Sequence, residues 1–239
     1  MAKFVDTHFH LDMYKNYNEL FNYINEHEQY TLCMTNSPGV FYSCMNMFEQ
    51  SKYIKFAIGF HPLNSNLRKK DMNDFIKLLP KTEYVGEIGL DFSKKNGLEY
   101  NDQIVFFDTI VKESAKNNKL MSIHIRKAEK EAFSIIDKYK PKRCIIHWYS
   151  GSIEYQKKFE DIGCYFSINA NMMNDFDLIK ELSTDRILIE SDGPYSKVNG
   201  KKFRPQLLEA EYEYISNSLG ISNLKEIVYS NFYKLLLDK

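Results

Sequence analysis

Residues 120–147 read LMSIHIRKAEKEAFSIIDKYKPKRCIIH, two short apolar runs that enclose one amphipathic segment. The runs at 120–124 and 143–147 are typical of buried strands, and the spacing of apolar residues in 128–139 is typical of a helix. Each run ends in a histidine, His124 or His147. Continuous apolar strands separated by a helix predict parallel pairing, with both histidines at one edge of the sheet.

The same alternation of strands and helices fills the chain of 239 residues. Six more strands are predicted at 3–7, 30–35, 54–59, 84–87, 164–168 and 186–190, and more helices at 101–118, 154–162, 206–219 and 223–237. With the two strands above, eight strands predict an α/β fold that closes into a TIM (β/α)8 barrel. No repeat, linker or low-complexity tract interrupts the pattern, so residues 1–239 are predicted to form a single domain.

Composition narrows the class of protein. The 32 basic and 32 acidic residues give zero net charge, which argues against a globally basic nucleic-acid binder and leaves a local basic patch open. The four cysteines form no Cys-x-x-Cys pair, so a zinc ribbon is not indicated. The N-terminus lacks an apolar leader, and no apolar run is long enough for a membrane span. A cytoplasmic location is expected.

Histidines and carboxylates gather at the predicted strand ends. His8 and His10 are two residues apart on the first strand, so their side chains share a face. A carboxylate closes the fourth strand, histidines close the fifth and sixth, and an aspartate follows the eighth. Parallel strands bring such side chains to one mouth of a barrel. The candidate metal ligands are therefore His8, His10, Glu87, His124, His147 and Asp192.

This group of side chains suits divalent cations. Imidazoles and carboxylates crowded at one mouth would leave buried charge unpaired without a cation, and mixed shells of this kind suit zinc, manganese or similar ions. Six ligands exceed one tetrahedral site, so two ions are predicted, Mg²⁺, Mn²⁺ or Zn²⁺, with Glu87 able to bridge them. Two close ions can activate water and stabilise charge on a phosphoryl group. Ordinary polar strand residues remain the alternative for any one of these positions.

Several motifs resemble the signatures of the TatD-type metal-dependent deoxyribonucleases. They lie at 6–12 (DTHFHLD), 59–62 (GFHP), 86–91 (GEIGLD), 123–128 (IHIRKA), 190–195 (ESDGPY) and 231–236 (NFYKLL). The resemblance runs in order from residue 4 to about residue 237. It implies a barrel of the metallo-dependent hydrolase type with two divalent ions, acting on DNA, often as a 3′–5′ exonuclease.

The resemblance also implies roles for single residues. One ion would be held by His8, His10 and Asp192, and the second by His124 and His147, with Glu87 between them. Asp192 is also the candidate base, since an aspartate beside an activated water can accept its proton. The predicted catalytic residues are therefore Asp192 and Glu87.

Substrate-binding residues are predicted around this centre. His61 is interpreted as a phosphate contact or as a donor that caps its strand, and Arg126 as a phosphate ligand or a structural ion pair. Trp148 could stack on a base or pack as an apolar lid, and Tyr149 offers a second flat surface. Basic residues that could follow a phosphate backbone are Lys94, Lys95, Lys201, Lys202 and Arg204.

Two departures from the family pattern bear on the substrate. Residues 148–151 read WYSG where the family usually has Cys-Phe-Ser-Gly, and the stretches 169–182 and 195–205 are shorter than usual. The compact outline resembles the TatD-like component of multi-gene anti-phage systems, the QatD type. That resemblance implies partner proteins and a role in defence; otherwise a monomer is expected.

Three functions are weighed. The first is a phosphodiester hydrolase that degrades single-stranded DNA from an end, in anti-phage defence or in DNA degradation and repair. The second is an amidohydrolase or lactonase, because one barrel and metal pair can attack a carbonyl as well. Such enzymes often bridge their ions with a carboxylated lysine, and Glu87 in that place favours the nuclease. The third is a subunit of a multi-protein complex with reduced activity, which the full set of six ligands disfavours.

Overall fold

The computed structural model, which describes residues 2–93, 97–174 and 176–237, contains two parallel sheets. Lys94 and Lys95 lie outside the described residues. The first sheet has the order β1 (Val5–Phe9), β2 (Tyr30–Cys33) and β3 (Ile54–Phe56). The second has the order β4 (Ile58–Phe60), β5 (Tyr84–Asp91), β6 (Leu120–Arg126), β7 (Cys144–His147), β8 (Tyr165–Ile168) and β9 (Ile187–Ile189).

The two sheets meet at Ala57, where the strand predicted at 54–59 is interrupted. The Ala57 amide donates to the Cys33 carbonyl at 2.8 Å. The Thr35 hydroxyl donates to the Ala57 carbonyl at 2.9 Å and accepts from the Gly59 amide at 3.1 Å. A Cβ on Gly59 would lie 1.5 Å from the Thr35 carbonyl oxygen, so only glycine allows this approach. The prediction of one continuous strand is wrong because the chain changes sheets here.

The opposite seam joins β9 to β1 and closes the ring. The Asp192 amide donates to the His8 carbonyl at 2.8 Å, and the His10 amide donates to the Gly193 carbonyl at 3.0 Å. The Thr7 hydroxyl reaches the Ile189 carbonyl at 3.0 Å. The two sheets together contain nine strands, β1 to β9. Because β3 and β4 occupy one position in succession, the described barrel has eight strand positions. The predicted (β/α)8 barrel is confirmed.

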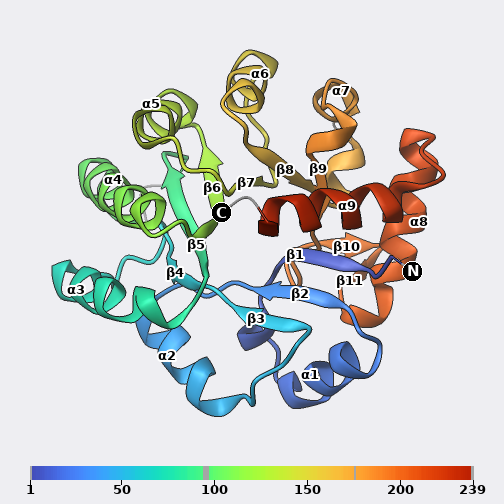
Figure 1. Cartoon of the computed structure of the whole chain (residues 1–239), viewed down its shortest axis with the longest axis horizontal. Coiled ribbons are helices and arrows are strands. Elements are labelled where there is room, and N and C mark those ends of the chain that lie inside the picture. Colours follow the sequence, from blue (N-terminus) through green and yellow to red (C-terminus); the bar gives the residue numbers. More distant parts are fainter. Residues whose placement is uncertain (1, 94–96, 175, 238–239) are drawn as a thin grey trace.

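Helices surround this ring in Figure 1, and α9 packs on β9 and β1. Their apolar faces meet the outer faces of the strands, which explains why the strands are buried on both sides. The helices are α1 (Tyr17–Glu26), α2 (Pro38–Met47), α3 (Lys69–Leu78), α4 (Tyr100–Lys116), α5 (Glu129–Tyr139), α6 (Ile153–Asp161), α7 (Phe176–Lys180), α8 (Leu208–Leu219) and α9 (Leu224–Leu237). Short 3₁₀ turns are η1 (Leu11–Met13), η2 (Leu79–Lys81), η3 (Ala170–Asn174), η4 (Thr184–Arg186) and η5 (Pro205–Leu207).

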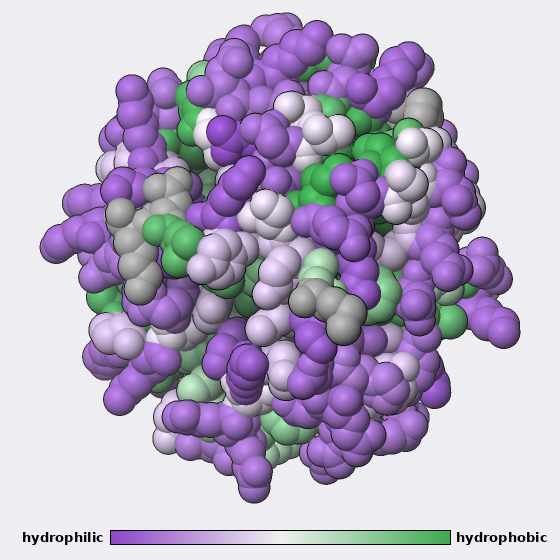
Figure 2. Space-filling model, turned by 45° about the vertical axis from the view of Figure 1, so that its right-hand side comes forward, coloured by the Kyte–Doolittle hydropathy of each residue, from purple (hydrophilic) through white to green (hydrophobic). Residues whose placement is uncertain are grey.

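A small antiparallel hairpin follows β9, formed by β10 (Lys197–Val198) and β11 (Lys201–Lys202). The sequence analysis did not predict it, because two-residue strands carry too little periodicity to detect. The face of the molecule drawn in Figure 2 is mostly hydrophilic, with small apolar areas. Among the described residues, the helices are too short or too polar to span a bilayer.

Candidate metal centre

The six candidate ligands converge at one mouth of the barrel. Five of them line a cavity of about 470 Å³, namely His10, Glu87, His124, His147 and Asp192. His8 lies fully buried beside them on β1. The hydrogen-bond register of parallel strands brings these positions together, and His124 is paired directly with His147 in the ladder between β6 and β7.

Four of the ligand atoms form a first cluster. The His8 Nε2 and His10 Nε2 atoms are 3.2 Å apart. The Glu87 Oε2 atom lies 3.6 Å from His8 Nε2 and 3.4 Å from His10 Nε2. The Asp192 Oδ1 atom lies 3.8 Å and 3.4 Å from the same two nitrogens. Bonds of about 2.0–2.2 Å to a tetrahedral ion would separate its ligand atoms by roughly 3.3–3.6 Å, so the donor set fits a metal ion.

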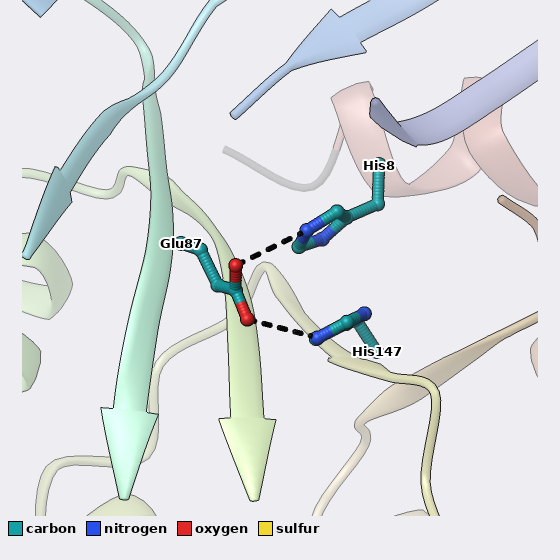
Figure 3. Close-up of side chains that lie close together, drawn as sticks. All are labelled: His8, Glu87 and His147. Atoms are coloured by element: carbon teal, nitrogen blue, oxygen red, sulfur yellow. Dashed lines mark hydrogen bonds and ion pairs between the residues drawn. The ribbon is translucent and has the colours of Figure 1, made fainter. Parts of the chain in front are cut away.

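The other oxygen of Glu87 belongs to a second cluster. Glu87 Oε1 lies 3.1 Å from His124 Nδ1 and 3.1 Å from His147 Nε2. These two nitrogens are 3.4 Å apart. Figure 3 shows Glu87 between His8 and His147, with one carboxylate oxygen directed at each. The single carboxylate therefore joins both clusters.

The outer nitrogen of three imidazoles has a fixed partner. His8 Nδ1 lies 2.8 Å from Ser122 Oγ. His124 Nε2 lies 2.9 Å from Asp91 Oδ2, and His147 Nδ1 lies 3.3 Å from Glu190 Oε2. Such partners hold the rings in place and select the tautomer that leaves the inner nitrogen free to bind a metal. The Glu190 carboxylate also accepts hydrogen bonds from Asn169 at 3.0 Å and from Ser167.

His61 approaches the centre as a donor. The Leu63 amide donates to His61 Nδ1 at 3.1 Å, so the hydrogen of the neutral ring lies on Nε2. That Nε2 atom is 3.1 Å from Glu87 Oε1. The geometry therefore gives His61 the role of a hydrogen-bond donor to the bridging carboxylate or to a substrate oxygen, although its position would also suit a ligand.

In the metal-free centre, protonated histidines balance the negative charges of the carboxylates. Burial opposes a charge on His10, but hydrogen bonds to Asp192 and Glu87 raise its pKa from 6.5 to about 10. Burial likewise opposes the charged form of Glu87, and the surrounding histidines, His61 first, hold its pKa well below 4.5. Burial and the positive charge of His147 lower the pKa of His8. The site thus holds protons where cations would bind.

The predicted substrate-binding residues fall into two groups. Arg126 and Trp148 line the cavity, and Arg126 forms no side-chain hydrogen bond or ion pair with any described residue. Lys201 and Lys202 are exposed on β11, and Arg204 is exposed just after it; none of the three lines the cavity.

Tyr149 does not offer a surface to the cavity. The residue is 3% exposed, its hydroxyl donates to the Ser152 carbonyl at 2.9 Å, and its ring packs edge-on against Phe159 and Phe166. The expectation of a second flat surface at Tyr149 is therefore wrong. Trp148 has a left-handed backbone with φ of 38°, which is unusual for a residue other than glycine, and it lines the cavity.

Asn36 and Tyr195 are among the cavity residues that were missed from the sequence. Asn36 follows β2, and the Oδ1 atom of its side chain is buried without a hydrogen-bond partner among the described residues. Tyr195 also lines the cavity and is 55% exposed. Their position in the sequence could have identified both as site residues. Each lies a few residues after a barrel strand, where the other site residues also lie.

A parallel barrel with buried imidazoles and carboxylates clustered at one mouth defines the class of metal-dependent hydrolases. The model of the TatD related DNase family matches residues 5–237, so the chain belongs to that family. It is a TatD-family metal-dependent hydrolase.

Relatives agree with this assignment. An uncharacterized metal-dependent hydrolase of Buchnera aphidicola is 28% identical, over 97% of this chain and 98% of that protein. A protein named deoxyribonuclease Tat-D from Schizosaccharomyces pombe is 24% identical, over 55% of this chain and 44% of that protein. The structure of a TatD homologue from Escherichia coli K12 shares the fold with a TM-score of 0.86, at 18% identity and 98% coverage of both chains.

Proposed function

We propose that the chain is a two-metal phosphodiesterase that hydrolyses DNA. The carrying observation is the Glu87 carboxylate, whose two oxygens each lie within 3.1–3.6 Å of a different pair of imidazoles. The first ion would be held by His8, His10, Asp192 and Glu87 Oε2, and the second by His124, His147 and Glu87 Oε1. Two divalent ions, Mg²⁺, Mn²⁺ or Zn²⁺, would supply Lewis acidity and an activated water.

The side chains of the mouth support a phosphate substrate. Asp192 is the group proposed to accept the proton of the attacking water, because its carboxylate reaches the first cluster and also faces the cavity. The guanidinium of Arg126 is free to pair with a phosphate oxygen, and His61 offers an N–H. A base and two donors in one cavity suit the hydrolysis of a phosphodiester.

DNA is the favoured polymer, and a single-stranded end is the favoured form. The family model bears the description of a DNase, and the S. pombe relative is named a deoxyribonuclease. Trp148 is partly buried at the cavity and can stack only on an unpaired base. We therefore propose that the enzyme cleaves DNA from a single-stranded end. The 3′–5′ direction is the first to be assayed.

The direct test is an assay with end-labelled single- and double-stranded DNA and Mg²⁺, Mn²⁺ or Zn²⁺, run beside a panel of amides and lactones. The account expects metal-dependent release of short products from single strands, lost on chelation. The alternative is an amidohydrolase, and a structure described as an uncharacterized amidohydrolase from Saccharomyces cerevisiae shares the fold with a TM-score of 0.79. Hydrolysis of an amide or lactone with no cleavage of any DNA would establish that alternative.

Removal of the Arg126 guanidinium should weaken substrate use. A hydrogen bond to a charged group contributes about 1.5–3 kcal/mol, so Arg126→Ala should lower kcat/KM on DNA roughly 10- to 150-fold. The slope of log affinity against log salt should fall by about one, since one phosphate contact is lost. Lys116→Ala, at the exposed end of α4 far from the cavity lining, is the control. Unchanged kcat/KM and salt slope in Arg126→Ala would assign Arg126 a structural role.

Metal affinity should rise with pH. His10 has a raised pKa of about 10 and is protonated at neutral pH in the metal-free chain, so a metal must displace its proton. Affinity should therefore increase by about tenfold per pH unit for each proton displaced, up to a pH near that pKa. Calorimetric titration with Mn²⁺ at pH 6.5, 7.5 and 8.5 measures the metal affinity. Repeating it in buffers of different ionisation enthalpy gives the number of protons released. Binding without proton release would contradict the proposed ligand role of His10.

The setting of the reaction is a further part of the proposal. Partner proteins and a role in anti-phage defence rest on the compact outline of the chain and its resemblance to the QatD type. A deletion strain of the source organism, challenged with phage and complemented with wild type or Asp192→Asn, would test the role in defence. Protection that requires Asp192 supports it, and equal sensitivity of all strains rejects it.

A further inference from the structure

Tyr195 is a large aromatic side chain that the proposed chemistry leaves unused. It lines the cavity and is 55% exposed. No described residue forms a hydrogen bond with its hydroxyl, whereas the imidazoles of the two clusters have hydrogen-bond partners. Its ring stands edge-on to the His10 ring, with centroids 5.5 Å apart and an angle of 83° between the planes. An open aromatic face therefore lies directly beside the first ligand cluster.

The turn that carries this ring has a well-held backbone. The Tyr195 amide donates to the Asp192 carbonyl at 2.8 Å, and the Ser196 carbonyl accepts from the Phe203 amide at 3.1 Å. A Cβ on Gly193 would lie 2.6 Å from a Phe203 ring carbon, so the turn is packed against the body of the protein. A rigid aromatic ring with few rotatable bonds loses little entropy on binding, which suits it to contact a flat ligand.

Trp148 is an aromatic cavity residue next in sequence to a ligand of the second cluster. It directly follows His147, whose Nε2 belongs to the second cluster, whereas Tyr195 follows Asp192, whose Oδ1 belongs to the first. Trp148 and Tyr195 leave the barrel from β7 and β9, with β8 between them. Each cluster thus has an aromatic cavity residue within three positions of one of its ligands.

We propose that Tyr195 is a stacking platform for the nucleobase on one side of the scissile phosphate, and that Trp148 stacks on the base of the other side. A phosphodiester bound across both clusters has one nucleoside at each end, and each nucleoside would meet one ring. Every base has a flat π-face, so such contacts bind single strands with little regard to sequence. This inference rests on the proposed function and names the residues that hold the two nucleosides.

The test uses single-stranded oligonucleotides that differ only in one abasic spacer, placed at the nucleotide on either side of the cleaved bond. Stacking on a base contributes about 1–3 kcal/mol, so Tyr195→Ala should raise KM and the Kd for the normal strand roughly 5- to 150-fold. That loss should vanish on one of the two spacer strands, and the loss from Trp148→Ala should vanish on the other. Tyr195→Phe should behave like wild type.

Controls separate stacking from structural support. Tyr233→Ala on α9 removes a tyrosine of matching exposure, 56%, outside the cavity and should change neither constant. Kd is measured by fluorescence anisotropy in EDTA, so that it is independent of turnover, and circular dichroism checks the fold of each variant. An equal loss on normal and spacer strands, or loss in kcat alone, would overturn the stacking role.

Failure of the inference and failure of the proposed function give different results. Wild type that cleaves DNA while Tyr195→Ala does so equally well on every strand would reject the platform and keep the nuclease. If the losses from Tyr195→Ala and Trp148→Ala both vanished on the same spacer strand, the placement of the two rings on opposite sides would be overturned. Wild type that neither binds nor cleaves DNA would reject both.

Discussion

Replacement of Glu87 by alanine is expected to abolish turnover and to reduce the content of both metal ions. Glu87 Oε2 belongs to the first cluster and Oε1 to the second, so one substitution removes a ligand from each. It also leaves protonated histidines without their buried counter-charge, which typically costs about 3–5 kcal/mol of stability. Glu87→Gln keeps the volume of the side chain and is the variant to use if Glu87→Ala unfolds.

His124→Ala is the matched control, because His124 reaches only the second cluster. Metal analysis by mass spectrometry should find about two ions per wild-type chain, about one in His124→Ala and fewer than one in the Glu87 variants. Circular dichroism reports whether each chain remains folded. Two bound ions and near-normal activity in a folded Glu87 variant would show that this carboxylate does not bridge.

Asp192→Asn is expected to lower turnover at least a hundredfold. The amide keeps the shape of the side chain but carries no charge and cannot accept a proton. Loss of a general base typically costs about 10²–10⁴ in rate, and loss of a ligand to the first ion adds to this. Asp192 has a left-handed backbone with φ of 46°, which asparagine tolerates well, so the fold should persist.

The comparison for this variant is Asp161→Asn, an exposed aspartate at the end of α6, which should leave kcat unchanged. Single-turnover cleavage of labelled DNA, at saturating metal, isolates the chemical step from metal loss. Activity of Asp192→Asn within a few-fold of wild type would move the role of base to Glu190, the next carboxylate in the same segment.

Much of the centre could be predicted from the sequence because barrel geometry is regular. Side chains two apart on a strand share a face, which paired His8 with His10, and the ends of parallel strands meet at one mouth. His124 and His147, 23 residues apart in sequence, are direct partners in the ladder. The position of a residue at a strand end therefore carried most of the spatial information.

Local backbone geometry beyond the strands could not be predicted. Trp148 and Tyr149 are adjacent aromatics, and their sequence does not show that Trp148, with its left-handed backbone, lines the cavity while Tyr149 is buried. The break at Ala57 depends on bonds from Cys33 and Thr35, more than twenty residues earlier. Periodicity reports the strand and its faces, but such long-range hydrogen bonds leave no periodic signal.

The basic residues of the β10–β11 hairpin illustrate the same limit. Lys201 and Lys202 follow a strand that carries a site residue, which suggested a place at the mouth. In the structure the hairpin holds them exposed and outside the cavity lining. Arg126, by contrast, lies at the end of β6 itself and lines the cavity.

Anomalous diffraction from crystals soaked in Mn²⁺ or Zn²⁺ tests the central claim most directly, because it locates each ion without relying on activity. Two peaks are expected, about 3.5–4 Å apart. One should lie among His8, His10 and Asp192, the other between His124 and His147, and both should contact Glu87. A single peak, or peaks that lie away from the Glu87 carboxylate, would contradict the two-metal account.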